Sequence, residues 1–217
     1  MPSLKSLNMP SIVATTLINA GLLCFFSQGV EIDAQVLTSF LNNWKLSGLA
    51  AAVSTATIAA LSLMLPRQVK DALVYLRWPY AAPGHRAFSI YAQRDIRVDY
   101  DRLKAEIPEL QDQWALTPEI ENKVWYRLFK THEKTEAVSH AHRMWLMFRD
   151  LTSLAYLFFG AFIIIGLYFK PGINWGLYLT IFTLELLVFW RAAWNSGEQL
   201  ICNVLAAVTS TNKSDES

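Results

Sequence analysis

The chain has 217 residues, of which 53% are hydrophobic and 17% are charged, and its formal net charge is +1. Soluble domains carry about 25% charged residues, and a nearly neutral chain lacks the basic field that favours nucleic-acid binding. The charges are also segregated, because residues 67–150 hold 14 of the 19 Lys and Arg, 12 of the 18 Asp and Glu, and all four His. Apolar blocks around one polar block indicate a membrane protein with a polar insertion.

Four apolar stretches are long enough to cross a bilayer as helices. Crossing ~30 Å of hydrocarbon takes about 20 apolar residues, and the stretches that qualify are residues 10–28, 46–65, 151–169 and 174–194. The first could be a cleaved signal peptide, but it is long and no small-x-small cleavage site follows it, so we expect it to be retained. The predicted fold is therefore an all-α membrane protein with four transmembrane helices and a mostly helical cytoplasmic insertion between the second and the third.

Basic residues near the span ends predict the orientation, because Lys and Arg are enriched in cytoplasmic loops. The loops at 29–45 and 170–173 offer one Lys each, Lys45 and Lys170. Six basic residues lie near the two ends of the 67–150 segment: Arg67, Lys70, Arg77, Lys134, Arg143 and Arg149. We therefore expect this segment and both termini to be cytoplasmic.

These spans divide the chain into four parts. Residues 1–66 form a first transmembrane hairpin, residues 67–150 the cytoplasmic insertion, and residues 151–194 a second hairpin. Residues 195–217 are expected to continue the last helix into the cytosol, where its apolar residues would pack, and to end in a disordered polar tail from Thr209. Cys24 and Cys202 would lie at different depths and are expected to be reduced.

The insertion is predicted to be mainly helical. Helices are expected from Arg67 to about Leu76 and over residues 101–106, while residues 85–100 fit either a short extended segment or a loop. Thr117-Pro118-Glu119 is a helix start. No breaker follows, so one long helix, straight or kinked, is expected from there to Phe169. Its aromatic stripe would need a partner surface, either residues 78–110 or a neighbouring subunit.

Glu185 is the most informative residue of the membrane part, because it lies near the middle of the fourth span. A carboxylate at that depth costs roughly 3 kcal/mol on insertion scales and should face protein or water rather than lipid. Asn19 lies at a similar depth in the first span and could hydrogen-bond to it. The pair is predicted to be a proton, cation or pore site, or alternatively a polar lock between helices.

The second span carries small residues at helical spacing. Gly48, Ala52, Ala56 and Ala60 form one stripe, beside a second that includes Thr55. Small residues let helix backbones approach closely in lipid. Two such stripes predict a homo-oligomer seam or a pore lining with Thr55 as a polar candidate, although packing within one bundle is the alternative.

The insertion offers a candidate binding site and a group of His residues. His85, Arg86, Arg94 and Arg97 could bind a charged ligand or a partner protein, because guanidinium groups recognise phosphate and carboxylate. The alternative is a salt-bridge network. His132 and His140 share a helix face, but neighbouring Lys and Arg favour a solvated surface, so no metal is expected.

Some segments of the middle of the chain resemble a known group of proteins. They are His85-Arg86-Ala87-Phe88-Ser89, Asp95-x-Arg97-x-Asp99, Trp125-Tyr126-Arg127 and Phe148-Arg149-Asp150. They resemble segments of small multi-span bacterial membrane proteins, some of which act as channel-like effectors in antiphage defence. This resemblance implies an oligomeric membrane effector.

Together these features predict an oligomeric channel or membrane-perturbing effector of the bacterial inner membrane, controlled by its cytoplasmic insertion. A membrane-anchored adaptor for a cytoplasmic partner is the alternative, and a small transporter is a weaker one. An enzyme is not expected, since the sequence has no phosphate-binding loop and no Ser/His/Asp set, and no cofactor is expected. The expected partners are the lipid bilayer, further copies of the chain, and a cytoplasmic protein or small charged ligand, but not nucleic acid.

Overall fold

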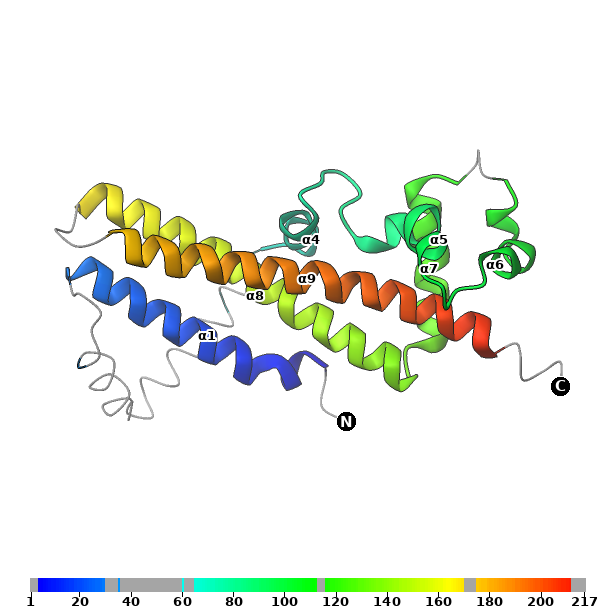
Figure 1. Ribbon diagram of the computed structural model, residues 1–217, viewed down its shortest axis with the longest axis horizontal. Helices are drawn as coiled ribbons and strands as arrows, with labels where there is room; N and C mark the ends of the chain where they lie inside the picture. Colours follow the sequence, from blue (N-terminus) through cyan, green and yellow to red (C-terminus); the bar gives the residue numbers. More distant parts are fainter. Residues whose placement is uncertain are drawn as a thin grey trace. The chain divides into compact units, whose positions relative to one another are not determined.

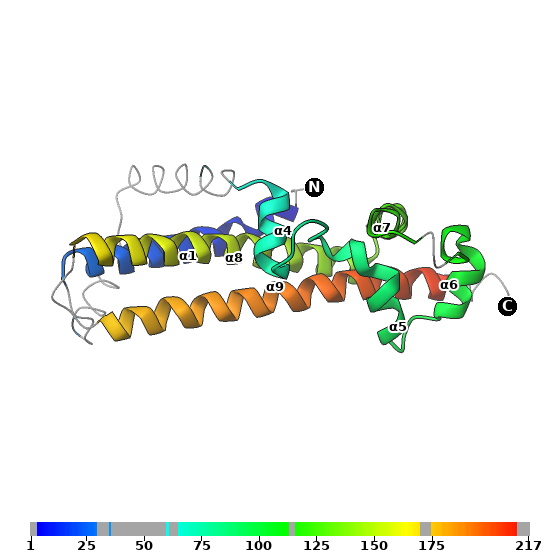
Figure 2. The same ribbon diagram turned by 90° about the horizontal axis from the view of Figure 1, so that it is seen from above.

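The computed structural model describes residues 4–29, 65–112, 116–169 and 175–211, together with Gln35 and Ala60. Regular structure in these residues is helical throughout (Figures 1 and 2). Three of the described helices are long and apolar enough to cross a membrane, over Ser6–Ser27, Glu136–Tyr168 and Trp175–Ser210. The all-helical membrane class is confirmed to that extent, while the predicted second span, residues 46–65, lies outside the described residues apart from Ala60 and Leu65.

The described residues fall into two compact units, and each is treated separately. The first is made from residues 1–66 and 149–190, and the second from residues 67–148 and 191–217. Two long helices supply residues to both units: α8 covers Glu136–Phe169 and α9 covers Trp175–Thr211.

The first unit contains α1, which covers Leu4–Ser27, with parts of α8 and α9. α1 begins before Pro10, the residue at which the predicted span begins, because a membrane helix tolerates one missing backbone donor. It ends at Ser27, and Gly29 follows with a φ of 72°, a left-handed conformation that favours glycine after a helix C-terminus. An aromatic cluster holds the three helices together: Phe26, Phe162, Tyr178 and Phe182.

The second unit is a small helical domain around one hydrophobic core. Its helices are α4 (Arg67–Tyr75), η1 (Pro83–Arg86), η2 (Ala87–Tyr91), α5 (Ala92–Arg94), α6 (Tyr100–Glu106), η3 (Pro108–Leu110) and α7 (Pro118–His132). In Figures 1 and 2, α5, α6 and α7 gather around the C-terminal part of α9. The apolar residues predicted on that part of α9 are all buried in this core: Leu200, Ile201, Val204, Leu205 and Val208.

The start signals predicted for the insertion helices are confirmed. α4 and α6 lie within a residue or two of their predicted bounds. The Thr117 side chain accepts a hydrogen bond from the Ile120 backbone N–H at the start of α7. Trp125 and Phe129, from the aromatic stripe of α7, are buried in the domain core, and α7 packs on η1 and η2. Residues 78–110 therefore provide the partner surface for this stripe.

Three predictions about helix bounds are wrong. The single helix expected from 118 to 169 is interrupted at Glu133–Thr135, where the Thr135 N–H bonds to the His132 carbonyl and α8 then begins. Residues 83–94 are short helical turns instead of an extended segment or an irregular loop. The tail expected from Thr209 is still helical to Thr211, because Thr209 is buried and its hydroxyl bonds to the Leu205 and Ala206 carbonyls.

Candidate functional site

The membrane part of the chain contains a polar contact between α1 and α9. Asn19 is fully buried, and its Nδ2 donates to Glu185 Oε1 at 2.7 Å and to the Thr15 carbonyl at 3.0 Å. Residues 166 positions apart in the chain therefore form the hydrogen bond that the sequence suggests. Their function as an ion or proton site stays a prediction.

The geometry of this contact leaves oxygen atoms available. Both N–H groups of the Asn19 amide are used, but its Oδ1 is buried and has no hydrogen-bond partner in the described part of the chain. Glu185 is only partly buried by α1 and its own helix. A buried acceptor without a partner costs about 1–3 kcal/mol, so a site with a free amide oxygen beside a carboxylate favours a proton donor or a cation.

The small-residue stripe of the second span is mostly outside the described residues. Gly48, Ala52, Thr55 and Ala56 lie there, and only Ala60 is described, as an exposed helical residue. The predicted homo-oligomer seam or pore lining therefore stays a prediction.

The four predicted binding residues of the insertion do not form a single site. Arg97 forms an ion pair with Asp95, with the shortest contact at 2.7 Å, and also donates to Asn203 Oδ1 at 3.1 Å. The hydrogen bonds from Arg97 lower the pKa of Asp95 to about 2. This part of the charged run is thus a network that ties the loop to α9, as the alternative interpretation proposed.

The other three residues are distributed around the domain. Arg94 lines a cavity of about 320 Å³ together with Tyr91, Asp95, Glu198 and Cys202. Arg86 is exposed. His85 lines a different cavity, and its Nδ1 lies 3.0 Å from the Ala82 carbonyl. The four residues therefore do not line one cavity in which they could bind a phosphate or carboxylate together.

The His residues near the α7–α8 turn are engaged separately. His132 Nδ1 lies 3.0 Å from the Leu128 carbonyl, and the His142 and Phe129 rings form a T-shaped pair with their centroids 5.0 Å apart. Among the described residues, no group of three or more metal-ligating side chains comes together.

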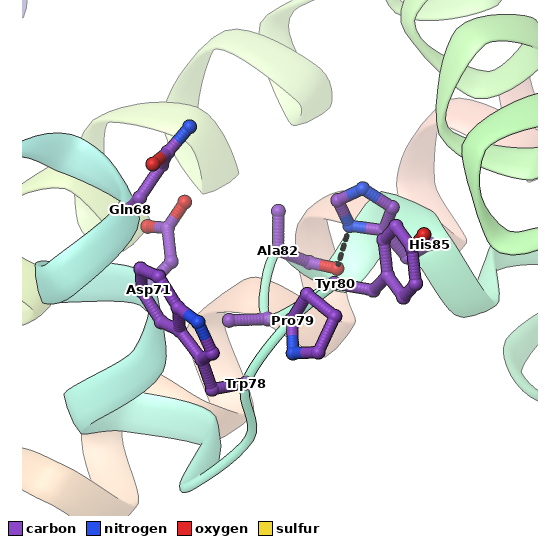
Figure 3. A pocket seen from close by; sticks show the side chains of 8 residues that line it. Gln68, Asp71, Trp78, Pro79, Tyr80, Ala82 and His85 are labelled. Carbon is purple, nitrogen blue, oxygen red and sulfur yellow. Dashed lines mark hydrogen bonds between the residues drawn. The ribbon is translucent and has the colours of Figure 1, made fainter.

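Two further positions were not predicted from the sequence. Glu121 is buried in α7, and its Oε2 accepts from the backbone N–H groups of Phe88 and Ser89 at 2.8 and 3.0 Å. This carboxylate holds η2 in place. A second cavity, of about 290 Å³, lies beside α4 and the loop that follows it (Figure 3). The Trp78-Pro79-Tyr80 run, which follows α4 after two residues, indicates a turn there but does not predict a cavity.

Comparison of the chain with models of protein families, with curated proteins and with solved structures finds no match. The function is therefore inferred from the residues and their geometry alone.

Proposed function

We propose that this protein is a four-span protein of the bacterial inner membrane that assembles into an oligomeric channel or membrane-perturbing effector. The insertion is cytoplasmic in this proposal, and both termini are on the same side. The observation that carries the proposal is the buried Asn19 beside Glu185, with an amide oxygen that no described residue uses. Intramembrane carboxylates are functional by default, since their insertion is costly and must be compensated.

The insertion would control the membrane site through α8 and α9. Each of these helices runs without interruption from the helical domain into an apolar stretch, and α9 carries both Glu185 and the core residues of the domain. A rigid helix is a suitable element for transmitting a shift of the domain. In this proposal, binding of a partner or ligand to the domain changes the environment of Glu185.

An adaptor function is the second candidate, and one exposed residue favours it. The Ile96 side chain is fully solvent-exposed on the loop before α6, at 101% of the reference area. Contiguous exposed apolar patches mark protein docking sites, and in an adaptor Ile96 would be the apolar centre of such a patch. An adaptor would use this loop to bind its partner, and Glu185 would only hold helices together.

The test is membrane depolarisation in bacteria that express matched amounts of wild type and variants. Glu185→Gln keeps an oxygen that can accept the Asn19 hydrogen bond but removes the ionisable group. We expect it to reduce depolarisation roughly tenfold or more, the effect of losing about 1.4 kcal/mol of ion stabilisation. Thr180→Val, on an exposed face of the same helix, is the control and should behave as wild type.

Two outcomes would contradict the channel. Wild-type depolarisation that Glu185→Gln leaves unchanged would make the residue a structural lock. If no variant depolarises the cells but Ile96→Asp abolishes recovery of a cytoplasmic partner, the adaptor is the better account.

A further inference from the structure

The loop that follows α4 carries a cluster of exposed apolar side chains over residues 76–80. Leu76 is 64% exposed, Trp78 is 68% exposed and Tyr80 is 42% exposed. The described part of the helical domain has two other exposed large apolar side chains, one on the loop before α6 and one on α7. Contiguous exposed apolar side chains of this kind mark a site of contact with another protein or with a membrane.

The backbone holds these side chains outside the domain core. Leu76 has a φ of 49° and Tyr80 a φ of 62°, so two bulky residues take the left-handed conformation on either side of Trp78. This conformation is unfavourable for residues with a Cβ and is found mainly where the surrounding structure fixes it, often at functional sites. Figure 1 shows the chain arching outward after α4 before it returns to the domain. The Tyr80 hydroxyl donates to the Glu119 carboxylate, which fixes the far end of the arch.

The near end of the 76–80 loop is fixed to α9 by Arg77. The Arg77 guanidinium lies over the Tyr75 ring, 4.9 Å from its centroid, and over the Trp194 ring, 5.9 Å from its centroid. The Tyr75 and Trp194 rings are themselves 5.1 Å apart. Such cation–π contacts stabilise the position of the guanidinium. The loop therefore leaves the domain at the level of Trp194 along α9.

Trp194 lies where the apolar stretch of α9 ends. Residues 175–190 contain a single charged residue, Glu185, and the next charge is the exposed Arg191. α9 is long and apolar enough to cross a membrane, and its predicted span ends at residue 194. Trp and basic residues are enriched at the ends of membrane-spanning helices, at the level of the lipid headgroups. The 76–80 loop therefore projects from the domain near the level at which α9 leaves the membrane.

The chemistry of the loop fits a lipid surface. Trp and Tyr place an apolar ring in a dry environment and keep a polar atom wet, which suits the membrane–water interface. Two exposed basic residues accompany the loop, Arg67 at the start of α4 and Arg191 on α9, and basic residues at this level attract anionic headgroups. α4 also begins two residues after the predicted second span, so the chain reaches the loop from the membrane on that side as well.

We propose that the 76–80 loop is a membrane-interface anchor, in which Leu76 and Trp78 enter the headgroup layer of the bilayer beside α9. The partner is the phospholipid surface of the membrane that α9 crosses. The anchor fixes the depth of the helical domain at that surface and limits its rotation about α9. It does not depend on the channel function, because an adaptor with the same loop would be held in the same way.

The test is electron paramagnetic resonance of the full-length protein in nanodiscs of phosphatidylethanolamine and phosphatidylglycerol. One nitroxide label at a time is attached in a Cys24→Ser, Cys202→Ser background, at Leu76→Cys or at Trp78→Cys. Ile96→Cys is the matched control, since Ile96 is an exposed apolar residue of the same domain. Collisions with oxygen, which concentrates in lipid, are compared with collisions with a water-soluble nickel chelate. Oxygen collisions should exceed nickel collisions at both loop positions, and the order should be reversed at Ile96→Cys.

A further variant tests whether Trp78 itself holds the loop in the interface. With the label at Leu76→Cys, Trp78→Ser should remove the excess of oxygen collisions, because a small hydroxyl side chain gains little free energy from leaving water. Tyr126→Ser, at an exposed aromatic residue on α7, is the control and should leave the excess unchanged.

Several outcomes would overturn the proposal. An excess of nickel collisions at both loop positions would show that the loop lies in water, and equal values at the loop and at Ile96→Cys would show that the loop has no preference for lipid. Low collision rates for both reagents would show that protein covers the loop. The cover is a second copy if the labels broaden each other's spectra until unlabelled protein is added, and another part of the same chain if they do not. An unchanged excess of oxygen collisions in Trp78→Ser would remove Trp78 from the anchor.

Discussion

Glu121 and Glu185 are both acidic residues on helices, but different groups satisfy their carboxylates. Glu121 accepts two backbone N–H groups within one folded domain. Glu185 accepts one amide N–H from Asn19, whose own oxygen is left over. The first arrangement is closed and stabilises the fold. The second leaves an oxygen without a partner among the described residues, which is why we propose a function for Glu185 and not for Glu121.

Replacing Glu121 should destabilise the protein strongly. Glu121→Ala leaves the N–H groups of Phe88 and Ser89 without an acceptor, and we expect a loss of about 3 kcal/mol in the free energy of unfolding. Glu121→Gln keeps one oxygen and should lose less. Thermal unfolding of the detergent-solubilised protein measures both. Glu133→Ala removes only an exposed ion pair with Lys130 and should change the midpoint little. Equal midpoints for Glu121→Ala and Glu133→Ala would refute the role of Glu121.

At the scale of elements, α4 and α9 approach very closely in the helical domain. A Cβ built on Gly197 of α9 would clash with the Tyr75 hydroxyl and lie 3.1 Å from the Trp145 ring. That hydroxyl is buried without a hydrogen-bond partner in the described part of the chain, and burial raises its pKa well above the usual value. Glycine is therefore required at this crossing because there is no room for a side chain. Its backbone conformation is that of an ordinary helix and would accept any residue.

The crossing predicts a non-additive pair of substitutions. Gly197→Ala should destabilise the domain by about 2 kcal/mol through overpacking, whereas Tyr75→Phe removes an unsatisfied hydroxyl and should stabilise it by about 1 kcal/mol. In the double variant the nearest clash is gone, so the cost of the Gly197→Ala substitution should fall by about 1 kcal/mol or more. Unfolding midpoints of the four proteins give this coupling. Additive effects would show that the two residues do not meet.

Local signals in the sequence predict those helices whose bounds do not depend on contacts with distant residues. Thr117-Pro118 and the apolar spacing of residues 200–208 correctly place a helix start and a buried face. Thr135-Glu136 is also a helix-start signal, a hydroxyl residue followed by an acid, and it coincides with the break before α8. The π-helical turn at 87–91 has no local signal, since Glu121, some 30 residues away, supplies its hydrogen bonds.

The candidate sites also divide into those that the local sequence reveals and those that depend on the folded structure. Burial cost alone singles out Glu185, and depth in the span suggests Asn19 as its partner. The cavity beside α4 could not be predicted in this way, because it depends on the left-handed backbone at Leu76 and Tyr80. The sequence suggests Arg97 as a ligand-binding residue, because a charge pattern does not reveal which charges form ion pairs. Its partner Asp95 is only two residues away.

For the whole molecule, the number of spans decides on which side of the membrane the domain and the termini lie. With four spans the two termini are on one side, together with the domain formed from residues 67–148 and the end of α9. If residues 46–65 did not cross, the loop before them and the insertion would share a side, and the termini would be on opposite sides. The excess of Lys and Arg in residues 67–150 favours a cytosolic domain in either arrangement. The loop at residues 29–45 holds a single Lys, which favours the first arrangement, with this loop on the opposite side.

Labelling of single cysteines in spheroplasts distinguishes the two topologies. In a Cys24→Ser, Cys202→Ser background, a membrane-impermeant maleimide should label Gln35→Cys. It should not label Ser3→Cys, Asp112→Cys or Ser214→Cys until the membrane is permeabilised, which serves as the control for reactivity. Labelling of Gln35→Cys and Asp112→Cys from the same side would show that residues 46–65 do not cross the bilayer. The small-residue stripe would then have no place in a transmembrane seam, and Glu185 would have to form any ion pathway with α1 and α8 alone.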